Sequence, residues 1–273
     1  MRWTLKPKPN PETVTKLASQ LGIEIPVASL LAQRGIEDFE SAKKFFRPSL
    51  EDLHDPFLMK DMDLAIFRIE KAIASEENIM VFGDYDVDGT TSVALISSWL
   101  KTFYPNVATY IPDRYDEGYG ISYKGIDFAA DNDISLIIAL DCGIKAIDKV
   151  AYASEKNIDF IICDHHRPGA EIPKAVAVLD PKREDCEYPY KELCGCGVGF
   201  KLMQAWVIQN GFSIDTLLPY LDLVATAIGA DIVPITGENR ILAYHGLRVI
   251  NVAPRPGFKA IIKQIKKETL TIT

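Results

Sequence analysis

Three aspartates stand at every second position of the segment 84–89, Asp-Tyr-Asp-Val-Asp-Gly, directly after the apolar run 79–82. A short apolar run of this kind predicts a buried strand, and alternate side chains of extended chain point to the same side. Converging carboxylates repel one another unless a cation lies between them. The segment therefore predicts a cation site where a strand ends.

Three kinds of cation chemistry use such a segment. An EF-hand calcium loop opens with the same pattern, but its twelfth position should be Glu and is Leu95 here. Residues 86–90 resemble the nucleophile motif of haloacid-dehalogenase-type phosphatases, in which Asp86 would be phosphorylated beside a single magnesium ion and no histidine is needed. The third kind is a site for several metal ions, which needs further ligands elsewhere in the chain.

Aspartate and histidine follow three other predicted elements. The apolar run 136–140 ends in Asp141, the run 160–163 ends in Asp164-His165-His166, and a helical stretch ends in Asp231. Ligands of open α/β sheets collect beyond the carboxyl ends of the strands, so we expect these side chains at one edge of a sheet. Carboxylate and imidazole groups converging from four segments indicate a metal site.

The elements that must position these residues alternate between strand and helix. We expect strands near residues 79–83, 107–111, 135–140, 159–163 and 175–179, and helices near 90–103, 122–131, 144–156, 197–210 and 214–229. This alternation predicts an α/β fold with a doubly wound, mostly parallel sheet. Residues 76–235 would form this domain, with a helical N-terminal segment at 1–75, where helices start near Pro11 and Asp38, and C-terminal helices at 236–273.

The composition is that of a globular protein. Of the 273 residues, 48% are apolar and 25% are charged, which is ordinary usage. No stretch approaches the ~20 apolar residues of a membrane span, and the first residues lack the apolar region of a signal peptide. The five cysteines show no paired zinc-binding spacing. Reduced thiols fit the cytoplasm, so we expect a cytoplasmic protein without a membrane partner.

The net charge of −8 has the wrong sign for a plain nucleic-acid binder. The segment 236–273 is nevertheless basic. Its candidates for phosphate contact are Arg255, Lys259, Lys263, Lys266 and Lys267. A solvated helix face explains the same residues equally well.

Taken in order, the motifs at 84–89, 141–143, 164–166 and 229–234 resemble the DHH phosphoesterase superfamily, and within it the RecJ family of single-stranded-DNA-specific exonucleases. The segments 111–120, 195–202 and 237–240 are similar to RecJ proteins as well. The resemblance implies a metal-dependent 5′-to-3′ exonuclease that hydrolyses single-stranded DNA to 5′-mononucleotides in DNA repair and recombination. It also implies single-stranded-DNA-binding protein and a helicase as partners.

The resemblance further implies two divalent ions, Mn²⁺ by preference or Mg²⁺. The matching metal ligands are Asp84, Asp86, Asp88, Asp141, His165 and Asp231, and all of these except Asp84, together with His166, form the expected catalytic set. Asp141 would bridge the ions, with Asp88, His165 and Asp231 on one and Asp84 and Asp86 on the other. Two such ions can activate a water and stabilise both the attacking and the leaving oxygen. His166 matches the family's phosphate-contacting histidine, and Asp164 is expected to orient His165.

Two further segments have two interpretations each. Arg114, Tyr115 and Tyr119 could line a groove for DNA through phosphate pairing and base stacking, or form a loop packed by its own aromatic rings. The glycines at 195, 197 and 199 could present backbone N–H groups to a phosphate, or allow close helix packing.

Other functions remain as alternatives. DHH phosphoesterases that act on short oligonucleotides, cyclic dinucleotides or polyphosphate share the ligands, but segments 111–120 and 237–240 favour RecJ. A non-catalytic, replication-associated binding module would have lost ligands, and none is lost here. RecJ-like proteins usually continue into a second domain (DHHA1) and an OB-fold, to which residues 236–273 would lead, so we expect activity to depend on those domains.

Overall fold

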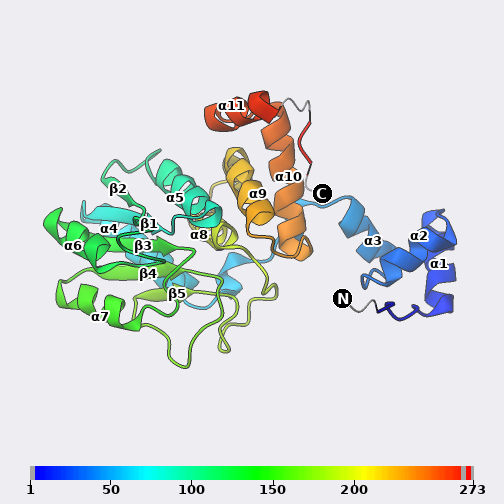
Figure 1. Cartoon of the computed structure of the whole chain (residues 1–273), viewed down its shortest axis with the longest axis horizontal. Helices are drawn as coiled ribbons and strands as arrows, with labels where there is room; N and C mark the ends of the chain where they lie inside the picture. The colour runs from blue at the N-terminus through cyan, green and yellow to red at the C-terminus, as the bar shows by residue number, and fades with distance from the viewer. Residues whose placement is uncertain (1–3, 266–268, 272–273) are drawn as a thin grey trace. The chain divides into compact units, whose positions relative to one another are not determined.

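The computed structural model describes residues 4–265 and 269–271. The chain forms two compact units, Met1–Leu53 and His54–Thr273. The first contains helices α1 (Pro11–Leu21), α2 (Ile25–Ala32) and α3 (Phe39–Phe46) and a short 3-10 turn, η1 (Leu50–Asp52) (Figure 1). Asn10 and Asp38 cap α1 and α3 by accepting hydrogen bonds from the N–H groups of Glu12 and Ser41, so both helices start where the sequence predicts.

The second unit is built on a five-stranded parallel sheet in the order β2-β1-β3-β4-β5. The strands are β1 (Asn78–Gly83), β2 (Val107–Tyr110), β3 (Ile134–Leu140), β4 (Asp159–Cys163) and β5 (Ala177–Leu179). The predicted doubly wound parallel sheet is confirmed. The chain moves outward from β1 to β2 and then crosses to β3, so the connections diverge between β1 and β3.

Helices cover both faces of the sheet (Figure 1). One face carries α6 (Tyr123–Asp131) and α7 (Ile147–Glu155), and the other carries α4 (Met62–Ala74), α5 (Val87–Leu100) and α8 (Gly195–Gln209). Helices α9 (Leu221–Ala230) and α10 (Gly237–Val252) pack beyond α5 and α8, and α11 (Pro256–Ile265) follows. A short 3-10 turn, η2 (Pro56–Leu58), precedes α4.

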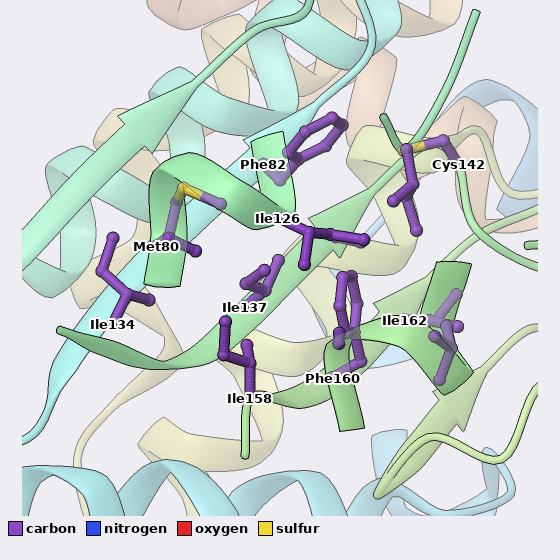
Figure 2. Packing of buried hydrophobic residues seen from close by; sticks show 14 of the residues in the cluster. Met80, Phe82, Ile126, Ile134, Ile137, Cys142, Ile158, Phe160 and Ile162 are labelled. Atoms are coloured by element: carbon purple, nitrogen blue, oxygen red, sulfur yellow. The ribbon is translucent and has the colours of Figure 1, made fainter. Parts of the chain in front are cut away.

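Alternate strand residues form the core under α6 and α7 (Figure 2). Phe82 lies beside Ala139 in the sheet, and Ala139 lies beside Ile162. Because every second side chain of a strand points to the same face, this register gives one continuous apolar layer. Removing that layer from water stabilises the sheet that positions the strand ends.

Two expected boundaries differ in the structure. The predicted N-terminal segment 1–75 includes residues 62–74, but these form α4, which packs against β5 and α8 and belongs to the second unit. Its buried Arg68 forms ion pairs of 2.6 Å with Glu77 and Asp159. The helix expected at 214–229 is divided into a 3-10 turn, η3 (Ile214–Tyr220), and α9, because Pro219 has no N–H to continue the hydrogen-bond ladder.

A buried ion pair joins α8 to α10. The Lys201 Nζ lies 3.0 Å from the Glu238 Oε1 and donates to the backbone carbonyl of His54 at 2.7 Å. The Tyr188 hydroxyl donates to the Glu238 Oε2 at 2.6 Å. Both charged side chains are almost fully buried, and each has the hydrogen-bond partners that a buried charge requires.

The five cysteines are buried and form no disulfide. In the parts of the chain that the structure describes, no helix has both the length and the apolar character needed to cross a membrane.

Helices α9 and α10 make their closest approach at Gly246. A Cβ added there would lie 2.1 Å from the Leu221 carbonyl oxygen and 2.6 Å from the Ala225 Cβ. We expect Gly246→Ala to lower the free energy of unfolding by about 1–3 kcal/mol, because the helices must separate to admit the methyl group. The matched control is Gly257→Ala in α11, where a Cβ would meet nothing within 4 Å. Urea denaturation followed by circular dichroism would show a lower midpoint for Gly246→Ala alone, and equal midpoints would contradict the expectation.

Candidate metal centre

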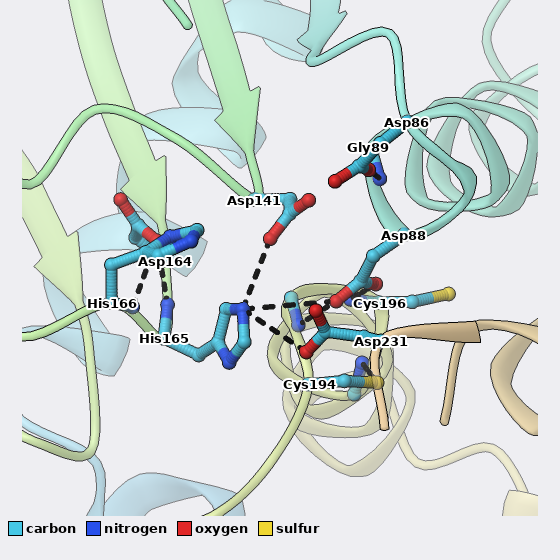
Figure 3. Close-up of polar contacts among 12 residues, drawn as sticks. Asp86, Asp88, Gly89, Asp141, Asp164, His165, His166, Cys194, Cys196 and Asp231 are labelled. Atoms are coloured by element: carbon cyan, nitrogen blue, oxygen red, sulfur yellow. Dashed lines mark hydrogen bonds and ion pairs between the residues drawn. The ribbon is translucent and has the colours of Figure 1, made fainter. Parts of the chain in front are cut away.

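Four segments meet at the carboxyl edge of the sheet (Figure 3). The segment 84–88 follows β1, Asp141 follows β3, the segment 164–166 follows β4, and Asp231 follows α9. Parallel strands all end at this edge, and the crevice between β1 and β3 is where the connections diverge. Open α/β sheets bind their ligands at such a point.

His165 lies at the centre of the cluster. Its Nε2 is 3.2 Å from the Asp141 Oδ1, 3.6 Å from the Asp231 Oδ2 and 3.8 Å from the Asp88 Oδ2. Two groups of three residues have ligand atoms that all lie within 4.8 Å of one another: Asp88 with His165 and Asp231, and Asp141 with His165 and His166. Each group combines carboxylate and imidazole donors, which suits a divalent transition metal.

The electrostatics of the cluster fit a cation. Burial, reinforced by neighbouring carboxylates, raises the pKa of Asp88 to about 7 and that of Asp141 to about 11. Burial lowers the pKa of His165 to about 4, so its ring is neutral at pH 7, as a metal ligand must be. The Asp141 Oδ1 and the His165 Nε2 are buried without a hydrogen-bond partner. A cation between them would satisfy both atoms and favour the ionised carboxylates.

Asp88 is fixed by the first turn of α8. Its two carboxylate oxygens accept hydrogen bonds of 2.7 Å from the N–H groups of Gly195 and Cys196. A Cβ on Gly195 would lie 2.6 Å from the Asp141 Oδ1. Close packing therefore requires a glycine at position 195. The N–H groups of Gly195 and Cys196 donate to the Asp88 carboxylate, whereas the acceptor considered from the sequence was a phosphate. The sequence did not predict this contact, because it joins residues 107 positions apart.

Helix α5 starts earlier than predicted. Its N-cap is Asp86, whose Oδ1 accepts a hydrogen bond of 2.9 Å from the N–H of Gly89. Asp88 therefore lies in the first helical turn, before the predicted start near residue 90. With its backbone in the helix, Asp88 can direct its side chain toward His165 and α8 (Figure 3).

Asp164 acts on its neighbours differently from the expectation. Its Oδ1 accepts from the backbone N–H groups of His165 and His166 at 2.7 and 3.1 Å, and pairs with the His166 Nδ1 at 2.7 Å. Its Oδ2 accepts from the N–H of Ile144. Asp164 thus accepts a hydrogen bond from the backbone of His165 and pairs with the ring of His166. From the sequence, Asp164 was expected to orient His165, and its pairing with the His166 ring was not predicted. The hydrogen bond to Asp164 raises the pKa of His166, and this pairing outweighs burial in lowering the pKa of Asp164.

Asp84 and Asp86 lie beside the two ligand groups and belong to neither. The Asp84 Oδ1 accepts from the N–H of Gly120 at 3.1 Å, and its Oδ2 is buried without a hydrogen-bond partner. Asp86 is exposed, and its charge contributes to the raised pKa values of Asp88 and Asp141. Their assignment to a second ion stays a prediction.

A row of rings extends outward from His166. The Tyr119 hydroxyl lies 3.2 Å from the His166 Nε2, and the ring of Tyr119 meets the ring of Tyr85 edge-on. The Arg114 guanidinium lies 5.0 Å from the centre of the Tyr85 ring, while Tyr115 is 93% exposed. The sequence prediction missed Tyr85, although its place between Asp84 and Asp86 points it away from the carboxylates.

The basic C-terminal residues divide into two kinds. The Arg255 Nε pairs with the buried Asp222 at 2.6 Å, so this guanidinium has a protein partner. Lys259 and Lys263 are exposed on α11. The two other phosphate candidates, Lys266 and Lys267, lie outside the described residues.

The comparisons with known proteins agree on one family. The family model described as "DHH family, N-terminal domain" matches residues 78–228. Over 263 residues, the chain is 43% identical to the single-stranded-DNA-specific exonuclease RecJ of Bacillus subtilis (strain 168). This match covers 96% of the chain but 33% of that protein, so the chain spans about a third of its length.

Two solved structures are similar in fold. The crystal structure of exonuclease RecJ bound to manganese superimposes with a TM-score of 0.71 and 29% identity, over 80% of this chain and 54% of that one. The RecJ of Thermus thermophilus in complex with Mn²⁺ superimposes with a TM-score of 0.79 and 25% identity, over 95% of this chain and 36% of that one.

The raised pKa values predict how stability depends on pH when no metal is bound. Folded Asp88 and Asp141 hold protons that the unfolded chain releases above its ordinary pKa of 3.8. Because folded Asp88 and Asp141 then bind more protons than the unfolded chain, their contribution to the free energy of unfolding falls as pH rises above about 4, and the Asp88 part of this fall ends near pH 7. The lowered pKa of His165 acts in the opposite direction below about pH 6.5, but one imidazole offsets only part of the effect of two carboxyls. Melting temperatures measured with a chelator between pH 5 and 8 would decrease, and excess manganese would reduce the decrease. A melting temperature that rises with pH in the chelator would contradict the expectation.

The substitution Asp141→Asn removes the carboxylate charge at the centre of the cluster and keeps nearly the same side-chain shape. Asp141 has a φ of 60°, a conformation that Asn adopts as readily as Asp, so the fold should be retained. We expect the metal-free variant to be at least as stable as the wild type at pH 7, because its side chain needs neither a buried charge nor a bound proton. A ligand at 100 times its Kd adds about 2.7 kcal/mol of stability, and the variant should lose most of this gain. Thermal unfolding with and without manganese checks both effects, and an unchanged metal response would contradict them.

Proposed function

Because the chain belongs to the DHH family, we propose that it forms the catalytic core of a metal-dependent 5′-to-3′ exonuclease. Its substrate is single-stranded DNA, and its products are 5′-mononucleotides. We place the phosphoesterase domain at residues 76–235, which enclose the matched stretch 78–228. Membership of this family removes the haloacid-dehalogenase alternative.

One observation carries the proposal: the cluster of three carboxylates, those of Asp88 and Asp141 buried and that of Asp231 exposed, around the neutral ring of His165. This cluster has the composition of a phosphodiester-cleaving metal site, and all of its members except Asp231 lie within the stretch 78–228 that matches the family. The relatives that share this part are named as single-stranded-DNA-specific exonucleases.

We propose Mn²⁺ or Mg²⁺ as the cofactor, since the compared RecJ structures hold manganese. Asp88, His165 and Asp231 would hold one ion, Asp84 and Asp86 would hold the other, and Asp141 would lie between them. Bound there, two divalent ions supply activation of water and neutralisation of the charge that develops on the phosphate oxygens.

The remaining groups bind and orient the substrate. His166, whose pairing with Asp164 raises the pKa of its ring, donates a hydrogen bond to a phosphate oxygen. The rings of Tyr85 and Tyr119 and the guanidinium of Arg114 offer faces on which unpaired bases can stack. Bases inside a duplex do not expose such faces, so this row favours a single strand. The order of cleavage from the 5′ end is taken from the resemblance to RecJ.

The biological setting follows from the same resemblance. We propose a role in DNA repair and recombination, with single-stranded-DNA-binding protein and a helicase as protein partners. The five buried thiols, none in a disulfide, suit the reducing cytoplasm.

The direct test uses one oligonucleotide labelled in two ways. With manganese, the wild type should convert 5′-labelled single-stranded DNA directly into labelled mononucleotide, whereas 3′-labelled DNA should give a descending ladder. Asp141→Ala and His165→Ala should each reduce the rate at least 100-fold, because each removes a ligand near the centre of the cluster. The same sequence annealed as a blunt duplex should be degraded much more slowly.

A matched control is Asp131→Ala. Asp131 is an exposed carboxylate that ends α6 shortly before β3 begins, so it lies at the opposite edge of the sheet, and its replacement should leave the rate unchanged. Equal, measurable rates in the wild type and both ligand variants would refute the metal-dependent mechanism. Release of mononucleotide first from the 3′ end would refute the proposed polarity.

A further inference from the structure

A small cavity adjoins the candidate metal centre. It has a volume of about 250 Å³ and shares Asp164 and His166 with the cluster described above. Its other walls are the loop that follows β3 and the segment around Tyr119. The cavity is smaller than the ~300–1,000 Å³ of drug-sized ligand sites, so it suits a small unit of a longer molecule.

Two lysines without a protein anion border this cavity. Lys145 and Lys149 both line it; Lys145 lies in the turn before α7 and Lys149 in the first turn of that helix. Among the described residues neither of them forms an ion pair, whereas Lys124 and Lys156, on the same face of the sheet, pair with Asp116 and Asp127. Two uncompensated cations at a cavity indicate an anionic ligand.

One side of the cavity, its floor, is formed by the loop after β3 and by buried apolar side chains. Ile121, Cys142 and Ile144 are each 2% exposed, and Gly143 between them has a φ of 116°. A Cβ at Gly143 would lie 3.1 Å from the Ile121 Cδ1, so the loop packs tightly and keeps the floor in place. The lining contains no Asn, Gln or Arg, the side chains that read base edges best. The walls thus suit a sugar–phosphate unit of any sequence.

We propose that this cavity binds a backbone phosphate of the DNA strand, next to the phosphate that is cleaved at the metal centre. Lys145 and Lys149 contact its oxygens, and the deoxyribose lies over the apolar floor. The inference deepens the proposed function and rests on it. The subsite holds the strand in register, independently of base sequence, while the neighbouring linkage is cut.

Salt dependence of binding tests the contacts separately from cleavage. Each phosphate neutralised on a single strand contributes about 0.7 to the slope of log K against log salt. With fluorescent oligo(dT) and a chelator to prevent cleavage, the double Lys145→Gln/Lys149→Gln variant should lower the magnitude of this slope by about 0.7, the contribution of one phosphate, and each single variant should lower it by part of that amount. Oligo(dA) should give the same differences. The double Lys→Arg variant, which keeps both charges, should retain the wild-type slope.

The matched control is Lys101→Gln, an exposed lysine that follows α5 on the other face of the sheet. Its slope should equal that of the wild type. Urea midpoints of all variants should coincide, which separates loss of contact from loss of folding.

A second binding experiment identifies which phosphate of the DNA strand occupies the cavity. One neutral methylphosphonate linkage, moved stepwise from the 5′ end, should weaken wild-type binding most at a single linkage, and the double Lys→Gln variant should show no further loss there. If the wild type binds and cleaves DNA but the double variant keeps the full slope, the subsite is wrong and the proposed function stands. If the wild type neither binds nor cleaves single strands, both are wrong.

Discussion

Mutual repulsion of buried carboxylates is the constraint on which the rest of this structure depends. Asp88 and Asp141 are nearly excluded from water and lie close to each other, which is unfavourable unless positive charge or hydrogen-bond donors surround them. The fold supplies donors from α8 to Asp88, and places the neutral ring of His165 beside both carboxylates. The sheet order, the early start of α5 and the glycine at the start of α8 all serve to bring these groups to one edge.

Much of this arrangement is readable from the sequence, since it depends on local pattern. Apolar runs ending in Asp or His predict strands whose ends carry ligands, and parallel alignment then brings the ligands together. What the sequence did not reveal depends on tertiary contacts. The bonds from Gly195 and Cys196 to Asp88, and the pairing of Asp164 with the ring of His166, need the packed structure to be seen. The division of the helix at Pro219 is local, and its signal was present in the sequence.

Two segments that resemble RecJ proteins without containing metal ligands also find an explanation. The segment 195–202 contributes Lys201, and the segment 237–240 contributes Glu238, and the structure pairs these two side chains in the interior. Their resemblance to the family thus reflects, at least at these two positions, a need for internal charge pairing. A buried charge left without its partner is strongly unfavourable, so replacing either residue alone is expected to destabilise the fold.

The position of Lys201 on α8 has a mechanical consequence. The same helix donates hydrogen bonds to Asp88 at its first turn and is tied to α10 through Glu238 fewer than two turns later. A helix transmits displacement along its axis with little loss over such a length, since its backbone hydrogen bonds are all internal. Helix α8 therefore joins the candidate metal centre to α10 through a short, rigid stretch of backbone, so the position of Asp88 depends on contacts at both ends of that stretch.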